Sequence, residues 1–503
     1  MPADMAARDR VRLFAVALAV LVFCALHAWR GFWVSDFWEH AAVVRELAVR
    51  PFSPRHPILA VDATHAFFSP YHLAIALAAR ATGASPISAL AIAGLVNIVL
   101  LVLALRRFLV RLLPEGAAAT PYALVFILLL WGRDAWWWSG FLHIDFLPFV
   151  VPYPSTFAAA GMFLGLSLLL DALDHGRVRA FGGIAILVAV CVIIHPPTAV
   201  VLFAGLAALF VARAHTRWLI NGALLLGAVV AGVAATMAWP YFPVLNLLVA
   251  PPREFHRYGA VFYQRVPAQI WPALLALPVL AWRLRRTRRD PLVLFVAFLG
   301  AIYALGAITG AYGLGRVIAY IVVFILIALA CAVATWECRL PARRAWLVPA
   351  YALLVAGVFA AYHRGRLVGI VRAEAPTWPV IEKILAPVAP ADVVLTDSRT
   401  SYVVPALTGG HVIGWRHPIY WVPDQTERRQ ALERFFAAAE DERRALIARY
   451  HVKWILLDRR QVALTPNEEG RLVALGSLVA QRESLVLLTM APFNALPREG
   501  DRK

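Results

Sequence analysis

Charged residues are scarce in this chain. Asp, Glu, Lys and Arg make up 16% of its 503 residues, whereas soluble domains carry about 25%. Hydrophobic residues make up 61% and occur in continuous runs. These runs are long enough to cross a bilayer as helix, which needs roughly 20 residues. Alternating segments of roughly ten residues, as a membrane β-barrel requires, are missing. The composition excludes an ordinary soluble protein and predicts a polytopic α-helical membrane protein.

Several common motifs are also missing. The four cysteines form no CxxC pair and no metal-ligand spacing. No glycine-rich phosphate loop opens a helix, the short loops hold no Asp-x-Asp pair, and no serine nucleophile elbow occurs. There is no internal repeat and no nucleic-acid-binding motif to accompany the net charge of +18. A reaction that uses a soluble nucleotide-sugar as donor is therefore disfavoured. Membrane lipids are the expected partners of the positive charge.

Apolar runs and arginine clusters alternate along residues 1–363 and predict about eleven transmembrane helices. The loops assigned to the cytoplasm hold 18 arginines, and the longer outer loops hold about ten. The first run, from Val11 to Gly31, is interpreted as a retained helix and not a cleaved signal peptide. This arrangement puts the N-terminus in the cytoplasm and the first outer loop, residues 32–85, outside.

From about residue 365 the composition becomes that of a soluble domain. Short buried strands are predicted at Asp392–Asp397 and Lys453–Asp458, with an amphipathic helix at Thr426–Tyr450 between them. Alternating strands and helices predict a small α/β domain with a largely parallel sheet. The expected organisation is thus a transmembrane body over residues 1–363 and an extracytoplasmic domain over residues 364–503.

The most polar part of the first outer loop begins directly after the first apolar run. Asp36 there is placed to deprotonate a hydroxyl or to bind a divalent ion. Glu39 would lie on the same helical face. The alternative is structural, with Ser35 or Asp36 capping a helix up to Val49. Acidic and histidine residues then recur through the loop and favour a functional role: His40, His56, Asp62, His65 and His72.

A second polar cluster lies among three tryptophans, Trp136 to Trp138, in a later outer loop. It contains Asp134, His143 and Asp145. For the tryptophans, an aromatic belt at the membrane interface is the favoured interpretation, and stacking on a sugar ring is the alternative. The belt does not explain His143 and Asp145, which are kept as candidates.

Basic residues near the outer ends of later helices are candidates for anion binding. Arg316 opens a late helix after a Gly-x-Gly turn and suits a phosphate oxygen, although an interfacial arginine extending to lipid headgroups is the alternative. Arg257 and Arg265 lie in another outer segment and are further candidates for a donor phosphate. His195 precedes two prolines; it either faces a cavity or bonds to carbonyls at a hairpin tip, and both interpretations stay open.

Taken together, the layout resembles the GT-C superfamily of integral membrane glycosyltransferases, which use polyprenyl-phosphate or pyrophosphate sugar donors. The segments that carry the resemblance are Trp33–Phe37, Phe67–Tyr71, Ile194–Pro196, Gly315–Arg316 and the tail strands ending at Asp397 and Asp458. The resemblance implies that Asp36 is the catalytic base and that Arg316 holds the leaving phosphate. Glu39 or Asp134 would be a second acid, with a possible divalent metal such as Mg or Mn. No two acidic residues are adjacent within residues 1–363, and the tail is no jelly roll, so metal dependence stays open.

The leading hypothesis is an inverting glycosyltransferase, transferring a hexosyl or pentosyl group in cell-envelope glycan or glycolipid assembly. It would act on the outer face of the bacterial cytoplasmic membrane, with a polyprenyl-phosphate sugar as donor and a glycan or lipid as acceptor. A transporter or flippase is the first alternative, but it predicts inverted repeats and charges within the helices. An O-antigen polymerase or ligase-like enzyme would not need the α/β tail. A non-catalytic scaffold with the tail as sensor is the last alternative.

Overall fold

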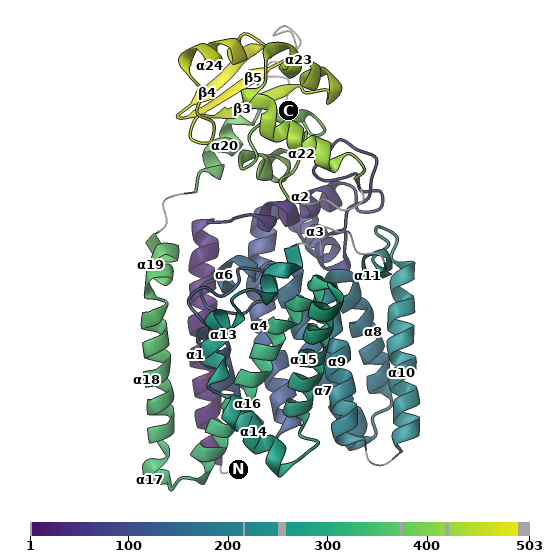
Figure 1. Ribbon diagram of the computed structural model, residues 1–503, viewed down its shortest axis with the longest axis vertical. Helices are drawn as coiled ribbons and strands as arrows, with labels where there is room; N and C mark the ends of the chain where they lie inside the picture. Colours follow the sequence, from purple (N-terminus) through teal and green to yellow (C-terminus); the bar gives the residue numbers. More distant parts are fainter. Residues whose placement is uncertain (1–2, 215–216, 250–257, 373–375, 418–421, 491–503) are drawn as a thin grey trace. The chain divides into compact units, whose positions relative to one another are not determined.

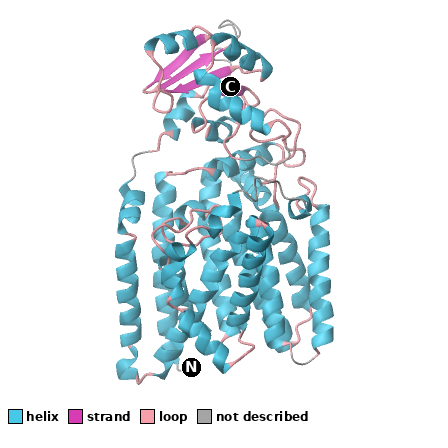
Figure 2. Ribbon diagram, in the orientation of Figure 1, coloured by secondary structure: helices cyan, strands magenta, loops and turns pink. Residues whose placement is uncertain are grey.

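The computed structural model describes residues 3–214, 217–249, 258–372, 376–417 and 422–490. Its contacts divide the chain into two compact units (Figure 1). The helical unit comprises residues 1–31 and 91–374, and the loop–sheet unit comprises residues 32–90 and 375–503. Figure 2 shows that the strands are confined to the second of these. The long loop after the first helix therefore belongs with the C-terminal segment and not with the helices that flank it.

The helical unit is built mainly from helices, with a long non-helical stretch over residues 130–146 between α5 and α6. Its helices are α1 (Ala3–Arg30), α4 (Pro86–Leu112), α5 (Gly116–Leu129), α6 (Leu147–Val150), α7 (Pro154–His175), α8 (Arg179–Ile194), α9 (Pro196–Arg213), α10 (Trp218–Ala235), α11 (Leu245–Val249), α13 (Val266–Leu274), α14 (Leu277–Arg286), α15 (Pro291–Thr309), α16 (Ile318–Arg339), α17 (Ala342–Ala345), α18 (Leu347–Tyr362) and α19 (Arg364–Arg372). Its 3₁₀ turns are η1 (Thr236–Ala238), η2 (Ala260–Tyr263) and η3 (Tyr312–Val317).

In the part of the chain that the structure describes, seven helices are long and apolar enough to cross a membrane. An eighth span is formed if α18 and α19, which meet at an angle of 63°, are counted together. The predicted number of eleven is not confirmed, because α5 and α8 are shorter apolar helices and the expected eighth span is divided into α13 and α14. The chain is a multi-pass helical membrane protein.

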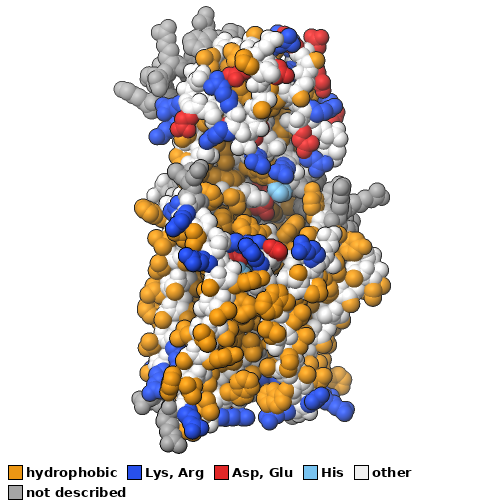
Figure 3. Space-filling view, turned by 60° about the vertical axis from the view of Figure 1, so that its left-hand side comes forward, with side chains coloured by type: hydrophobic (Ala, Val, Ile, Leu, Met, Phe, Trp, Pro, Cys, Tyr) orange, Lys and Arg blue, Asp and Glu red, His pale blue; other side chains and the backbone are white. Residues whose placement is uncertain are grey.

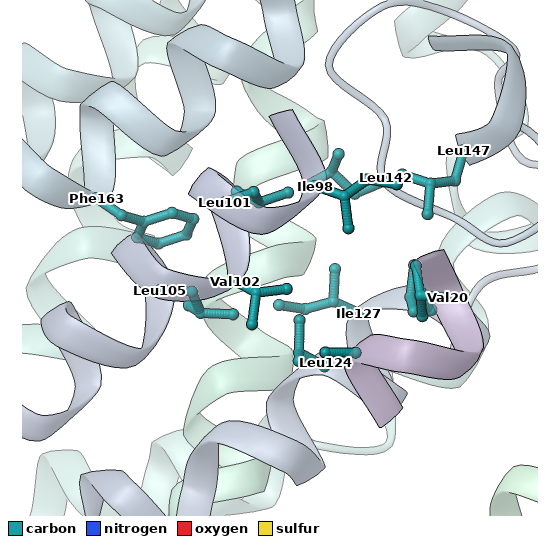
Figure 4. Close-up of a pocket in the computed structure, with 12 residues that line it drawn as sticks. Val20, Ile98, Leu101, Val102, Leu105, Leu124, Ile127, Leu142, Leu147 and Phe163 are labelled. Carbon is teal, nitrogen blue, oxygen red and sulfur yellow. The ribbon is translucent and has the colours of Figure 1, made fainter. Parts of the chain in front are cut away.

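Helix α16 is the most deeply buried span, with 89% of its apolar window inside the protein. It is apolar on all sides, as expected of a helix surrounded by others. It packs against α5 and α15, where Phe295 and Phe324 stack with ring centroids 4.2 Å apart. A dry cavity of about 30 Å³ remains nearby, lined only by apolar side chains of α1, α4, α5, α7 and the segment around Leu142 and Leu147 (Figure 4).

One end of the helical unit gathers basic residues. At this end Arg12 of α1 forms an ion pair of 2.7 Å with Glu337 near the end of α16. The buried Asp171 carboxylate pairs with Arg107 at 2.9 Å and Arg111 at 3.1 Å. Figure 3 shows Lys and Arg side chains below an apolar belt. Because α16 has 22 residues, its first residue lies about 33 Å away, at the opposite end of the helical unit.

The loop–sheet unit combines the first outer loop with the C-terminal segment. Its helices are α2 (Asp36–Val49), α3 (Pro70–Thr82), α20 (Trp378–Ile384), α21 (Val404–Thr408), α22 (Gln425–Arg434), α23 (Glu440–Arg449) and α24 (Pro466–Val473), with turns η4 (Thr400–Tyr402) and η5 (Phe435–Ala437). Its strands are β1 (Val393–Leu395), β2 (His411–Val412), β3 (Trp454–Asp458), β4 (Ser477–Arg482) and β5 (Leu485–Thr489).

The five strands follow the order β2-β1-β3-β5-β4. Strands β2, β1 and β3 are parallel, but β5 and β4 pair in an antiparallel manner, so the sheet is mixed and not largely parallel as predicted. The first outer loop extends this sheet, because the Val412 amide donates to the Ile58 carbonyl at 2.8 Å. Helix α2 packs on α21, where the Arg45 side chain donates to the Ala406 carbonyl at 2.7 Å.

Candidate functional site

Asp36 is the first residue of α2 and is half-buried. The preceding Ser35 has φ 50° and ψ −124°, a backbone conformation that is unfavourable for a residue with a Cβ. Its hydroxyl donates to Asp36 Oδ1 at 2.9 Å and makes no capping bond to the helix. The N-cap interpretation of Ser35 is therefore wrong. Among the described residues no basic group pairs with Asp36, which leaves its second oxygen available to a substrate.

His417, from the C-terminal segment, contacts Ser35. Its Nε2 lies 3.3 Å from Ser35 Oγ. Since the one hydroxyl proton of Ser35 is directed to the carboxylate, the histidine N–H is the donor in this second bond. The result is a chain of donors, His417 to Ser35 to Asp36, that stabilises the carboxylate. His417 was not among the residues predicted from the sequence, although a histidine between Trp415-Arg416 and Pro418 in the tail is an unusual polar residue in an aromatic setting.

The histidines of the first outer loop form a buried cluster behind α2. His65 Nδ1 accepts from the Phe67 amide, so its Nε2–H is directed at Glu39 Oε1, 3.2 Å away. His40 Nδ1 lies 2.9 Å from His72 Nε2, and His72 Nδ1 lies 2.8 Å from Ser69 Oγ. Sequence alone did not predict these pairings. Glu39 and His40 thus hold α2 against the loop, and neither is presented to solvent.

His56 belongs to the same cluster and has a structural role. Its Nδ1 accepts from the backbone amides of Ile58 and Leu59, at 3.2 and 3.0 Å. Burial, reinforced by the nearby positive charge of other side chains, lowers the pKa of His56 to about 2. Burial also lowers the pKa of His72 to about 3. Both rings are therefore neutral at physiological pH.

In the helical unit, Arg316 lies in η3 at the end opposite the arginine-rich one. Its Nη2 donates to Ser139 Oγ at 3.2 Å, and its guanidinium lies over the ring of Trp138, 5.1 Å from the centroid. His195 follows the last residue of α8, and Arg316 is the charged group near it. A Cβ on Gly140 would lie 3.8 Å from His195 Cε1. The structure thus brings Arg316 and His195 together around one segment, 138–140.

Asp145 is fully buried and pairs with His363, a residue that was not predicted from the sequence. Its Oδ2 lies 2.7 Å from His363 Nδ1 and 3.7 Å from Arg366 Nη1. His363 Nε2–H donates to the Leu129 carbonyl. Arg366 also binds Asp134, which is exposed. His363 stands where the bend between α18 and α19 occurs, so this cluster fixes the last span. A histidine at the end of the last apolar run was the available clue.

The remaining candidates are dispersed. His143 is buried, and its Nε2–H donates to the Trp136 carbonyl at 3.0 Å. Asp62 and Arg265 are exposed. Arg257 lies outside the described residues. Within the described ranges no three His, Cys, Asp or Glu side chains are arranged to hold a metal ion.

The fold and these two polar centres describe a multi-pass helical protein with an attached mixed α/β sheet. No protein-family model matches the chain, and no curated protein matches its sequence. Solved structures do match in fold. One is the archaeal oligosaccharyltransferase AglB from Archaeoglobus fulgidus in complex with an inhibitory peptide and a dolichol-phosphate, with a TM-score of 0.52, 13% identity, and coverage of 88% of this chain and 69% of that one.

The same archaeal enzyme tethered to an acceptor peptide containing the NVT sequon matches with a TM-score of 0.52, 12% identity and the same coverage. Its apo form matches with a TM-score of 0.51, 13% identity, and coverage of 88% and 69%. These structural neighbours are GT-C superfamily membrane glycosyltransferases. The likeness is one of fold, at low sequence identity, and it agrees with the GT-C resemblance predicted from the sequence.

Proposed function

We propose that this chain is an inverting glycosyltransferase that moves a sugar from a polyprenyl-phosphate donor to an acceptor hydroxyl. The observation that carries the proposal is the carboxylate of Asp36, which follows the first span, is oriented by Ser35 and keeps one oxygen available. A general base needs an ionised group with an open oxygen within reach of the proton it removes. The fold shared with oligosaccharyltransferases, one of them bound to a dolichol-phosphate, supports the choice of a lipid-linked donor.

In the proposed reaction, the acceptor oxygen attacks the anomeric carbon from the face opposite the phosphate. Asp36 takes the hydroxyl proton as the new carbon–oxygen bond forms. The bond between the anomeric carbon and the phosphate oxygen breaks, and the lipid phosphate leaves with both electrons. Arg316 stabilises the negative charge that develops on this leaving group, since a fixed guanidinium suits phosphate oxygens. The proton on Asp36 is then released to water.

We further propose that the transfer occurs on the outer face of the bacterial cytoplasmic membrane, in cell-envelope glycan assembly. The arginine-rich end of the helical unit contains Arg12 of α1 and would face the cytoplasm under the positive-inside rule. Arg316 lies at the other end of α16, on the side expected to be extracytoplasmic. The domain over residues 364–503 would face the same compartment.

The test uses the purified full chain in nanodiscs with a radiolabelled polyprenyl-phosphate sugar and a lipid or glycan acceptor. Replacing Asp36 by Asn should lower the transfer rate by about 10²- to 10⁴-fold, the usual contribution of a general base. The matched control is Asp62→Asn, an exposed acid of the same loop. Unchanged transfer by D36N would refute the role of Asp36. Movement of the intact lipid-linked sugar across proteoliposomes, without transfer, would instead identify a flippase.

A further inference from the structure

Two buried hydroxyl groups connect the first turn of α16 to His195. The Tyr320 hydroxyl, on α16, lies 2.9 Å from Thr198 Oγ1, on α9. Thr198 Oγ1 lies in turn 2.7 Å from His195 Nδ1. Tyr320 and Thr198 are 2% and 0% exposed. Buried hydroxyl groups in such a series fix the orientation of the ring at its end.

Two directions are open to the protons of this series, because each hydroxyl has one proton to donate. If Tyr320 donates to Thr198 and Thr198 donates to His195 Nδ1, the proton of the neutral ring is on Nε2 and has no acceptor among the described residues. In the reverse direction the Tyr320 proton is the one without an acceptor there. A ligand that brings an acceptor to Nε2 selects the first direction, since a buried donor left unpaired costs about 1–3 kcal/mol.

That Nε2–H is buried and has no hydrogen-bond partner in the described part of the chain. It belongs to a ring that lies beside Gly140, where an added Cβ would be 3.8 Å from His195 Cε1, and the neighbouring Ser139 accepts a hydrogen bond from Arg316. A neutral N–H donor with no acceptor, next to a guanidinium, suits a ligand that brings negative oxygens. Phosphate groups supply several such oxygens.

We infer that His195 Nε2–H is a second donor to the phosphate oxygens of the sugar donor, beside Arg316, and that Thr198 and Tyr320 are positioning residues that hold its tautomer. The inference rests on the proposed function. His195 contacts the phosphate directly, whereas Tyr320 acts only through Thr198. It also explains why a histidine stands between an apolar helix and two prolines, because the turn between α8 and α9 presents the ring beside η3.

The test measures binding of farnesyl phosphate to the full chain in nanodiscs, through the fluorescence of the tryptophans beside Arg316. Replacing His195 by Phe should weaken binding by about 10- to 100-fold, the effect of losing a hydrogen bond to a charged group. Replacing His195 by Gln, whose amide N–H reaches the position of Nε2, should restore most of the affinity. Tyr320→Phe should give a smaller loss, and Thr198→Ser, which keeps the hydroxyl, should give none.

The matched control is Tyr122→Phe, which removes another buried phenol, at the arginine-rich end. In transfer assays, H195F and Y320F should raise the KM for the donor more than they lower kcat. Competition by inorganic pyrophosphate separates recognition of the phosphate from recognition of the lipid. If H195F and Y320F both bind farnesyl phosphate with wild-type affinity while Arg316→Gln binds it weakly, His195 does not contact the phosphate. The proposed function would still stand in that case. If the wild-type chain binds neither farnesyl phosphate nor pyrophosphate, both fail.

Discussion

Lowering the pH should destabilise the loop–sheet unit through its buried histidines. The rings of His56 and His72 have pKa values of about 2 and about 3 in the folded protein, against 6.5 when unfolded. Above pH 6.5 neither state binds the proton, and the stability is fully present. Below pH 6.5 only the unfolded chain binds it, so the free energy of unfolding falls. Between pH 7 and pH 5 the loss is about 2 kcal/mol for each ring.

This figure depends little on the folded pKa, because both values lie well below pH 5. The assay is hydrogen exchange of the α2 amides in the full chain at pH 7 and pH 5. His56→Asn keeps an acceptor for the two backbone amides but does not titrate. The protection factor of the α2 amides in the wild type, divided by that in H56N, should fall by about 30-fold from pH 7 to pH 5. The control is His175→Asn, at the exposed end of α7. An unchanged ratio in H56N would refute the reasoning.

Three further predictions concern other parts of the chain. Replacing Asp145 by Ala leaves His363 buried without its carboxylate and should cost about 3–5 kcal/mol in thermal unfolding; the control D134A removes only an exposed partner. Replacing His417 by Ala breaks the donor chain to Ser35 and should lower kcat while leaving donor binding unchanged, as measured by kinetics. Val102→Leu should fill the apolar cavity and raise stability by up to about 1 kcal/mol; lower stability would show that the cavity cannot accept another methylene.

The membrane helices were predictable because an apolar run of span length rarely adopts any form but a transmembrane helix. The number of transmembrane helices was not predicted correctly, in part because Pro272 and the Leu275-Ala276 turn divide the expected eighth span into two helices. In the tail, strands β1 and β3 were expected from their continuous apolar runs, and both are buried. Strand β4 was missed because it lies at a sheet edge and its residues are partly buried or exposed, so no buried apolar run marks it.

The site was predictable only in part. A carboxylate after the first span and an arginine at a helix start are visible in the sequence, so Asp36 and Arg316 could be proposed. The contacts that define their surroundings join residues far apart: Ser35 and His417 are separated by 382 positions, and Asp145 and His363 by 218. The hydrophobic periodicity of a sequence cannot identify contacts between residues so far apart. The histidines of the cluster were likewise expected to have a functional role, but their burial shows that the cluster is largely structural.

The loop–sheet unit is discontinuous in sequence, and this has a consequence for biosynthesis. Residues 32–90 are made first, but the strands they join lie beyond residue 375. The ribosome must add the intervening segment, residues 91–374, before Ile58 can pair with Val412. At roughly 5–20 residues per second this delay is on the order of 15 to 60 seconds. During that interval the nascent loop lacks its edge partner, so a chaperone of the receiving compartment, or transient contact with the bilayer surface, would have to shield it until translation ends.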